Sequence, residues 1–337
     1  MPKTKYVTAE LQYQILMALY ENSRVSFREL GRKLNISHNT IATVIKNCQE
    51  KYSLVYTLEL SEQALGFSEG RLITIKFEKI PDIGLLKEKF QKDSFVQDAY
   101  LASGDFDLLL YVVGLTAQDF QSWQFNLRKN FHDYGPLLKT STVSYHTVGF
   151  FPLRNEIIME SAVLNNTDKR ILALLNGDSR MKLKELIKKG NTTQMRVIYT
   201  VKKLKEKGII RRFSALTQNP EKKLFLAYGA LLTPIKEHSK LSLSLAAEYI
   251  KENLHEVTNE CCLVVDANGA YDTFYICTFE NGEMMAKRGP SLLKTLWAEE
   301  NPKIESALLT GIIVGKWPFH LEEYRTYKEF VKAQTND

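Results

Sequence analysis

The sequence predicts an α+β protein made of two copies of a winged helix-turn-helix followed by a ferredoxin-like βαββαβ domain. The first observation is an internal repeat, since residues 14–55 and 170–211 align without a gap at an offset of 156. The second is a change of period within each copy, from helical spacing to strand-like alternation. The third is the order of the later segments, which is βαββαβ in both copies.

Three helices are predicted in each copy of the repeat. In the second copy Thr167–Asp168 precedes apolar residues at helical spacing, which indicates a capped first helix. A short second helix is expected around residues 183–187, and Gly190–Asn191 forms the turn before a third helix over residues 192–207. Two short helices joined by a tight turn are typical of a helix-turn-helix.

The third helix of the second copy is the predicted reader of DNA. Its residues Val197, Val201 and Leu204 recur at i, i+4 and i+7 and should face the core, which would turn a polar stripe outward. Arg can fork onto guanine, Thr, Gln and Tyr can meet bases or phosphates, and arginines on the following extended segment would hold phosphates. The predicted contacts are Thr193, Gln194, Arg196, Tyr199, Thr200, Lys203, Arg211 and Arg212, with Arg196, Thr200 and Lys203 as the stripe.

The first copy has the same pattern with less positive charge. Residues 164–219 hold fourteen Lys and Arg against four acidic residues, whereas residues 10–60 hold six against five. We therefore expect the second helix-turn-helix to supply most of the DNA affinity. The candidate DNA contacts of the first copy are His38, Asn39, Thr40, Thr43 and Asn47.

A βαββαβ unit is predicted after each helical unit. The first has strands at residues 71–77, 96–101, 108–115 and 140–147, with helices at 85–90 and 117–131. The second has strands at residues 224–232, 260–266, 273–279 and 304–315, with helices at 243–254 and 291–299. Such a unit packs one sheet face on two helices and leaves the other face uncovered. We expect the two sheets to pair face to face.

Composition narrows the class of protein. The chain has 337 residues, of which 44% are hydrophobic and 25% charged, as in a globular protein. No stretch approaches the ~18 apolar residues of a membrane span, and residues 1–6 lack the apolar core of a signal peptide, so a cytoplasmic location is expected. The four cysteines form no C-x-x-C pair. We expect no metal, no cofactor and no catalytic residue.

Several segments together resemble a known family. They are residues 164–172, the helix exit Gly208–Arg211, the turns Gly104–Asp107 and Gly269–Asp272, and the sheet ends at residues 149–152 and 315–318. In this order, in both halves, they resemble the Lrp/AsnC family, the feast/famine transcription regulators. The resemblance implies a winged helix-turn-helix for double-stranded DNA and a RAM-type regulatory domain that dimerises through its sheet. One chain would form a pseudo-dimer, and we expect a homo-oligomer, a dimer of such chains.

The resemblance also implies an amino-acid effector near the repeated turn. Carried over, the effector candidates are Gly104, Asp105, Asp107, Gly269 and Asp272. Ala270 departs from the family pattern because it removes one carboxylate. A structural interpretation stays open, in which these residues simply form tight turns.

The expected domain boundaries follow from the repeat. They are 1–62 and 160–219 for the winged helix-turn-helix domains, 68–153 and 222–318 for the RAM-type domains, and 319–337 for a C-terminal helical tail.

The leading interpretation is a sequence-specific DNA-binding transcription regulator and not an enzyme. One alternative is a siroheme-decarboxylase-like enzyme, since such enzymes have a similar two-domain fold and use histidines around a tetrapyrrole; His146, His255 and His320 keep it open. The other is a chromatin-like architectural protein that binds DNA without sequence preference and with a steep salt dependence.

Overall fold

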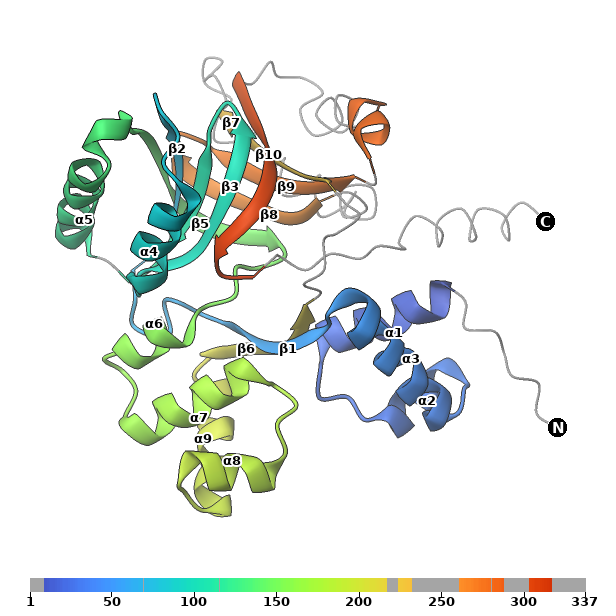
Figure 1. Ribbon diagram of the computed structural model, residues 1–337. Helices are drawn as coiled ribbons and strands as arrows, with labels where there is room; N and C mark the ends of the chain where they lie inside the picture. Colours follow the sequence, from blue (N-terminus) through green and yellow to red (C-terminus); the bar gives the residue numbers. More distant parts are fainter. Residues whose placement is uncertain are drawn as a thin grey trace, which may run out of the picture. The chain divides into compact units, whose positions relative to one another are not determined.

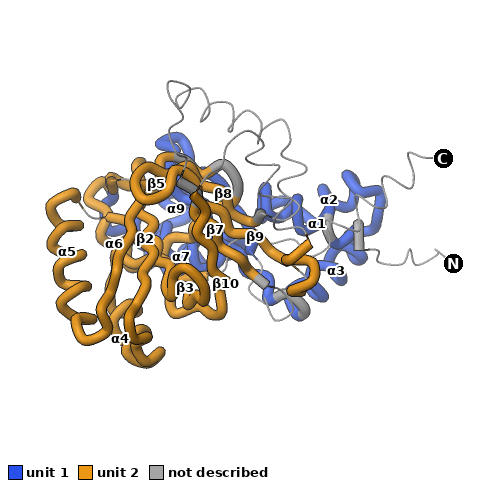
Figure 2. Tube along the Cα trace, turned by 90° about the horizontal axis from the view of Figure 1, so that it is seen from above, with its two compact units in different colours: residues 1–61, 164–220, 319–337 blue, residues 62–163, 221–318 orange. Residues whose placement is uncertain are grey.

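The computed structural model of the chain is shown in Figure 1. It describes residues 9–68, 70–114, 116–216, 224–231, 261–279, 281–287 and 303–316. These residues form two compact units, and each unit combines parts of both copies (Figure 2). The helix-turn-helix unit contains the described residues 9–61 and 164–216, and the barrel unit contains those within 62–163 and 224–316. The predicted helices at 243–254 and 291–299 and the predicted tail at 319–337 lie outside the described residues.

The first helix-turn-helix contains three helices, as predicted. Ser26 and Ser37 cap the second and third helices, since their side chains accept hydrogen bonds from the backbone N–H groups of Glu29 and Thr40. Asn35 closes the turn with φ 53°, a left-handed conformation that asparagine tolerates. The helices are α1 (Ala9–Glu21), α2 (Phe27–Leu34) and α3 (His38–Tyr52).

The second helix-turn-helix repeats this arrangement. Asn191 has φ 47° at the position equivalent to Asn35, which gives a physical reason for this identity in the repeat. The cap of the first helix is Asn165, whose side chain accepts a 2.9 Å hydrogen bond from the Asp168 N–H. The predicted cap at Thr167–Asp168 is therefore wrong, because both residues lie inside the helix. The helices are α7 (Asn166–Gly177), α8 (Leu183–Gly190) and α9 (Gln194–Glu206).

A two-stranded antiparallel sheet joins the two copies in this unit. The strand β1 (Val55–Leu60) follows α3 and pairs with β6 (Ile210–Leu216), which follows α9. Ala215 of β6 is buried in the core that α1, α2 and α3 form. Likewise, β1 packs against α7. The strand after each third helix therefore completes the domain of the other copy.

Reciprocal polar contacts reinforce this joint. The Oγ atoms of Ser23 and Ser179, both fully buried, are 2.6 Å apart. Arg24 Nε donates to the Ser179 carbonyl at 2.7 Å, and Arg180 Nη1 donates to the Ser23 carbonyl at 2.8 Å. Both pairs are identical residues of the repeat, so the contacts obey an approximate two-fold symmetry within one chain.

The barrel unit is a closed antiparallel barrel with strand order β10-β3-β4-β2-β5-β8-β9-β7. Each copy contributes four neighbouring strands, and the copies meet where β5 pairs with β8 and β10 pairs with β3. The two sheets are thus joined edge to edge, which the prediction of face-to-face pairing did not include. The strands are β2 (Arg71–Lys76), β3 (Val96–Gly104), β4 (Leu108–Val112), β5 (Leu137–Val148), β7 (Leu224–Leu231), β8 (Cys261–Gly269), β9 (Thr273–Phe279) and β10 (Lys303–Val314).

Two helices cover the outer face of the first-copy sheet (Figure 1). They are α4 (Ile83–Lys92) and α5 (Ala117–Asn130), whose Phe90 and Leu127 pack with Ile73 in one core. A further short helix, α6 (Asn155–Glu160), follows β5 and was not predicted. Within the described part of the chain, no helix is long and apolar enough to cross a membrane.

Candidate nucleic-acid interface

The polar stripe predicted on α9 does not face solvent. Thr200 is fully buried, and the side chains of Arg196 and Lys203 are 38% and 24% exposed. The outward orientation is therefore wrong for Thr200 and only partial for the two cations. Successive residues of an α-helix are about 100° apart, so a stripe one position before the core stripe lies beside it, not opposite.

A buried carboxylate on α7 holds this stripe. Asp168 is fully buried and accepts hydrogen bonds from Thr200 Oγ1 at 3.0 Å, Lys203 Nζ at 2.6 Å and Arg196 Nη2 at 3.3 Å. Asn165 Nδ2 adds a fourth at 2.8 Å. Since a buried charge needs paired and hydrogen-bonded partners, the cluster is complete in itself. Asp168 thus holds both Arg196 and Lys203 against the domain and offsets one of their two positive charges.

Asp168 was not identified from the sequence as a buried partner of α9, although its position in the helical pattern of α7 indicates burial. Asp168 stands three, four and seven positions before Ile171, Leu172 and Leu175, so it occupies the same inward stripe of α7. A charged residue at such a position requires partners from another element. The equivalent residue of the first copy is Gln12.

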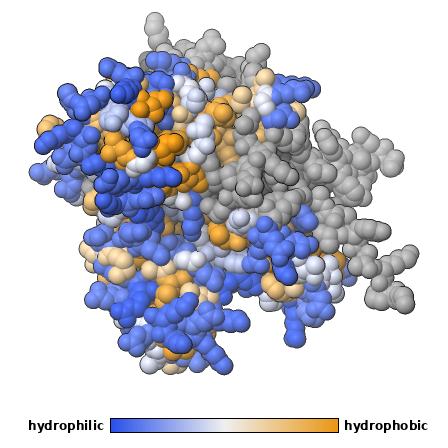
Figure 3. Space-filling view, viewed as in Figure 1, coloured by the Kyte–Doolittle hydropathy of each residue, from blue (hydrophilic) through white to orange (hydrophobic). Residues whose placement is uncertain are grey.

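The solvent face of α9 carries large, mainly apolar side chains at its first two turns. Met195 is 75% exposed, Tyr199 59% and Ile198 47%. Gln194 is exposed, and Thr193 is the N-cap whose Oγ1 accepts from the Arg196 N–H at 3.3 Å. In Figure 3 hydrophobic residues interrupt the hydrophilic surface of the part that holds α7, α8 and α9.

The two arginines predicted on the extended segment lie on β6. Arg212 pairs with Glu59 of β1 at 2.6 Å, and its guanidinium lies 4.1 Å from the ring centre of Tyr20. Arg211 is exposed, with its Nη2 3.5 Å from Ser61 Oγ. Of the two, Arg211 is the one whose charge is turned toward solvent.

The first copy presents the polar face that was predicted for it. His38, Asn39, Thr43 and Asn47 of α3 are exposed, and Thr40 is half-buried. Thr43 Oγ1 donates to the Asn39 carbonyl at 3.0 Å, and Thr40 Oγ1 lies 2.9 Å from Ser37 Oγ. These side chains are short and carry both donors and acceptors.

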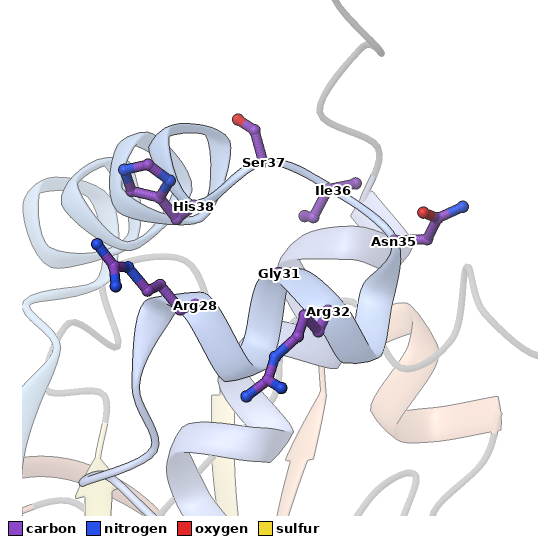
Figure 4. Close-up of a pocket in the computed structure, with 7 residues that line it drawn as sticks. All are labelled: Arg28, Gly31, Arg32, Asn35, Ile36, Ser37 and His38. Carbon is purple, nitrogen blue, oxygen red and sulfur yellow. The ribbon is translucent and has the colours of Figure 1, made fainter.

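A basic hollow of about 860 Å³ lies at the turn before α3 (Figure 4). Arg28 and Arg32 extend from α2 and His38 from the start of α3. Gly31 permits the close approach of the turn, since a Cβ there would lie 2.7 Å from the Ile36 carbonyl oxygen. The two guanidinium groups point in different directions in Figure 4, so each could contact a phosphate of its own. Neither Arg28 nor Arg32 was among the predicted contacts.

The predicted effector residues of the first copy make structural contacts. The Asp107 carboxylate accepts from Lys76 Nζ at 2.7 Å and from the Phe77 N–H at 2.9 Å. The Asp105 carboxylate accepts from the Ser306 N–H of the second copy at 2.7 Å.

The two turns are equivalent in their close backbone approach. A Cβ on Gly104 or Gly269 would lie 2.4 Å or 2.5 Å from the carbonyl oxygen of Ser306 or Thr140, and both glycines have positive φ. The Asp272 carbonyl accepts from the Ala267 N–H at 2.8 Å. This bond lies within the hairpin, whereas the Asp105 N–H to Ser306 carbonyl and Ala270 N–H to Thr140 carbonyl bonds hold each turn against the last strand of the other copy.

Of the three histidines that keep the enzyme alternative open, His146 lies among the described residues. The His146 ring packs on Tyr111 and Phe151 with ring centres 6.1 Å and 6.0 Å apart. His255 and His320 lie outside the described residues. Among the residues that the structure describes, no group of three or more His, Cys, Asp or Glu is placed to hold a metal ion.

The fold and this interface define a class, proteins with a pair of winged helix-turn-helix domains. The family profile for winged helix-turn-helix DNA-binding domains matches residues 9–51 and 164–211, once in each copy. An uncharacterised HTH-type transcriptional regulator of Pyrococcus furiosus is 31% identical over 104 residues, which are 30% of this chain and 68% of that protein. The HTH-type transcriptional regulator LrpA of Pyrococcus horikoshii is 30% identical over 111 residues, which are 31% of this chain and 74% of LrpA.

The chain therefore belongs to the Lrp/AsnC family of helix-turn-helix transcriptional regulators, as a tandem duplication. A solved structure resembles it over almost its full length. The siroheme decarboxylase NirDL aligns with 96% of this chain and 99% of its own, with a TM-score of 0.57 and 15% identity. At this identity the likeness establishes a common fold, with the duplicated arrangement in a single chain.

Proposed function

We propose that the chain is a cytoplasmic regulator of transcription that binds double-stranded DNA in a sequence-specific manner with both helix-turn-helix domains. The observation that carries the proposal is the exposed polar face of α3 beside the basic hollow formed by Arg28 and Arg32. A DNA reader needs phosphate contacts for register and groups at base edges for specificity, and this domain offers both.

In the first domain α3 would contact base edges. Asn39 and Asn47 can each form two hydrogen bonds with adenine, and His38 and Thr43 can also contact bases. Since the N-terminal part of a recognition helix lies deepest in the major groove, His38 and Asn39 are well placed for this role. Arg28 and Arg32 would contact flanking phosphates.

The second domain would supply most of the electrostatic affinity, with contacts other than those predicted. Arg196 and Lys203 are hydrogen-bonded to Asp168, so phosphates would be held by lysines on α8 and on the outer face of α9. The first of the two helices of a helix-turn-helix crosses the DNA backbone, and α8, which holds this place before α9, carries several of these charges. The exposed cations that follow α7 in this domain are Lys182, Lys184, Lys188, Lys189, Lys202, Lys205, Lys207 and Arg211.

The joint within the helix-turn-helix unit supports binding as a pair. The β1–β6 ladder and the buried Ser23–Ser179 contact connect the two domains in one chain, so both would reach DNA in one encounter. Unequal domains then favour an asymmetric pair of half-sites. Association of two chains and an amino-acid effector at the Gly104 and Gly269 turns stay predictions.

The test is an anisotropy titration of the full chain with labelled duplexes selected from a random pool. Replacing Asn39 and Asn47 with Ala should relax base preference by about 1–3 kcal/mol for each lost bidentate contact. Replacing Lys184 and Lys188 with Ala should weaken binding to every duplex and lower the salt slope by about one for each lysine.

The matched control is Lys87→Ala, an exposed lysine of α4 in the barrel unit, which should leave binding unchanged. Absence of binding to any duplex at low salt would refute the proposal. Binding with a steep salt slope and no selected sequence would favour the architectural alternative.

A further inference from the structure

The two third helices present different chemistry at equivalent exposed positions. Residues Met195, Ile198 and Tyr199 of α9 correspond to Asn39, Ala42 and Thr43 of α3 at the repeat offset. The residues of α9 are 75%, 47% and 59% exposed. Exposed large apolar side chains on a helix beside a strongly charged surface call for a binding explanation.

The apolar face continues into a groove between α8 and α9. Its volume is about 520 Å³, and it shares Ile198 with the exposed face. Leu183 and Leu186 of α8 form one wall, and Val197 and Val201 of α9 form the other. Arg24, Lys202 and Lys205 stand among its lining residues, so cations border the apolar surface.

Charge complementarity selects the occupant. The surface around the groove carries the exposed lysines of α8 and α9 named above, with Glu206 as the acidic residue in the lining. A polyanion that also presents small apolar groups fits this surface. In the major groove of DNA, the C5-methyl group of thymine is the apolar group at a base edge.

Contacts with Asp168 engage the polar side chains that were predicted to form hydrogen bonds with bases. Arg196 and Lys203 are bonded to the buried carboxylate, and Thr200 is buried with them. The exposed side chains of Met195 and Ile198 have no hydrogen-bond donor. Base contacts made by Met195 and Ile198 are therefore apolar, beside the polar groups of Gln194 and Tyr199.

We propose that α9 recognises thymine methyl groups through Met195, Ile198 and Tyr199, while the surrounding lysines hold the phosphates. This inference rests on the proposed function and specifies the half-site that the second domain takes. The duplicated domains would then divide recognition, since α3 forms hydrogen bonds with base edges and α9 forms apolar contacts with T-rich sequence.

The first experiment uses the unaltered full chain. The duplexes that it selects from a random pool are resynthesised with uracil in place of thymine, which removes the methyl group and keeps the base pair. Binding should weaken about fourfold for each contacted methyl group. Equal binding of the thymine and uracil duplexes would overturn the inference while leaving DNA binding itself intact.

The second experiment locates the effect on α9. A triple variant, Met195→Asn, Ile198→Ala and Tyr199→Thr, gives α9 the residues of α3 at these positions, and circular dichroism checks its fold. It should bind the thymine and uracil duplexes with nearly equal affinity. A single Ile198→Ala variant provides the same test with a smaller change and should reduce the ratio in part.

Leu137→Asn is the matched control, because this apolar residue of the barrel unit is 63% exposed. It should keep the full preference for thymine. If the triple variant also kept that preference, the methyl groups would be recognised elsewhere and the inference would fail. An α9 face that binds an acidic protein segment instead would show as a thymine-to-uracil ratio of one.

Discussion

Replacing Asp168 with Asn tests how the second helix-turn-helix is held together. The substitution keeps the shape of the side chain and removes a fully buried negative charge that accepts hydrogen bonds from Thr200, Lys203, Arg196 and Asn165. Breaking a buried ion pair by removing one partner costs about 3–5 kcal/mol. Because the Lys203 and Arg196 side chains are 24% and 38% exposed, both can turn to water and recover part of this loss.

The amide keeps one oxygen that can accept from the buried Thr200 hydroxyl, but its NH2 group lies where Lys203 and Asn165 donate. An unsatisfied buried polar group costs about 1–3 kcal/mol. We therefore expect a loss near the lower end of the range, about 3 kcal/mol for opening of this domain. The assay is native-state hydrogen exchange of α7 and α9 peptides in the full chain, which reports local opening. The expected effect is exchange about a hundredfold faster.

Glu206→Gln on the exposed face of α9 is the control and should change exchange by less than about threefold. The reasoning is refuted if Asp168→Asn accelerates exchange of α7 and α9 no more than this control. A change confined to the barrel unit would refute it equally, because Asp168 contacts α9 within the helix-turn-helix unit.

Three further predictions concern other parts of the molecule. Burial raises the pKa of Asp98 to about 8, so between about pH 4 and 8 the folded state holds a proton that the unfolded state has lost. The unfolding free energy should therefore fall as pH rises through this range. Denaturant titrations at a series of pH values measure this slope, and Asp98→Asn should flatten it. Gly104→Ala should lower the unfolding free energy of the barrel by about 1–3 kcal/mol, because a Cβ would lie 2.4 Å from the Ser306 carbonyl oxygen at a φ of 151°. A change below about 0.5 kcal/mol in a denaturant titration would contradict this. Arg180→Met removes the hydrogen bond to the Ser23 carbonyl and should speed exchange in α1 as well as α7, whereas Arg170→Met, which lies on α7 away from this joint, should leave α1 unchanged.

Local sequence patterns predicted most helices and strands of the described residues. The periods of 3.6 and 2, with caps such as Ser37 and turn residues such as Asn35, act over a few neighbouring residues and are therefore legible in the sequence. The repeat supports these predictions, because equivalent segments of the two copies show the same helix or strand pattern. The cap of α7 was misplaced because Asn165, Thr167 and Asp168 are all acceptable cap residues and only their contacts distinguish them.

The candidate site was predicted in part. The exposed polar face of α3 and the exposure of Tyr199 agree with the sequence, since both follow from the helical period. The orientation of Arg196, Thr200 and Lys203 differs from the prediction, because the helical period gives only the angles of side chains about the helix axis. Which side of the core stripe meets a neighbouring helix depends on where that helix packs.

The sequence alone determines the duplication, the helix-turn-helix and βαββαβ units, and the unequal charge of the two halves. Three features depend on packing between distant segments: the exchange of β1 and β6 between copies, the closure of the barrel at β5–β8 and β3–β10, and the capture of the α9 stripe by Asp168. The physical reason is range. Backbone propensity and side-chain period act within one turn or one strand, whereas a buried charge or an open sheet edge is satisfied by whichever distant group the folded chain brings to it.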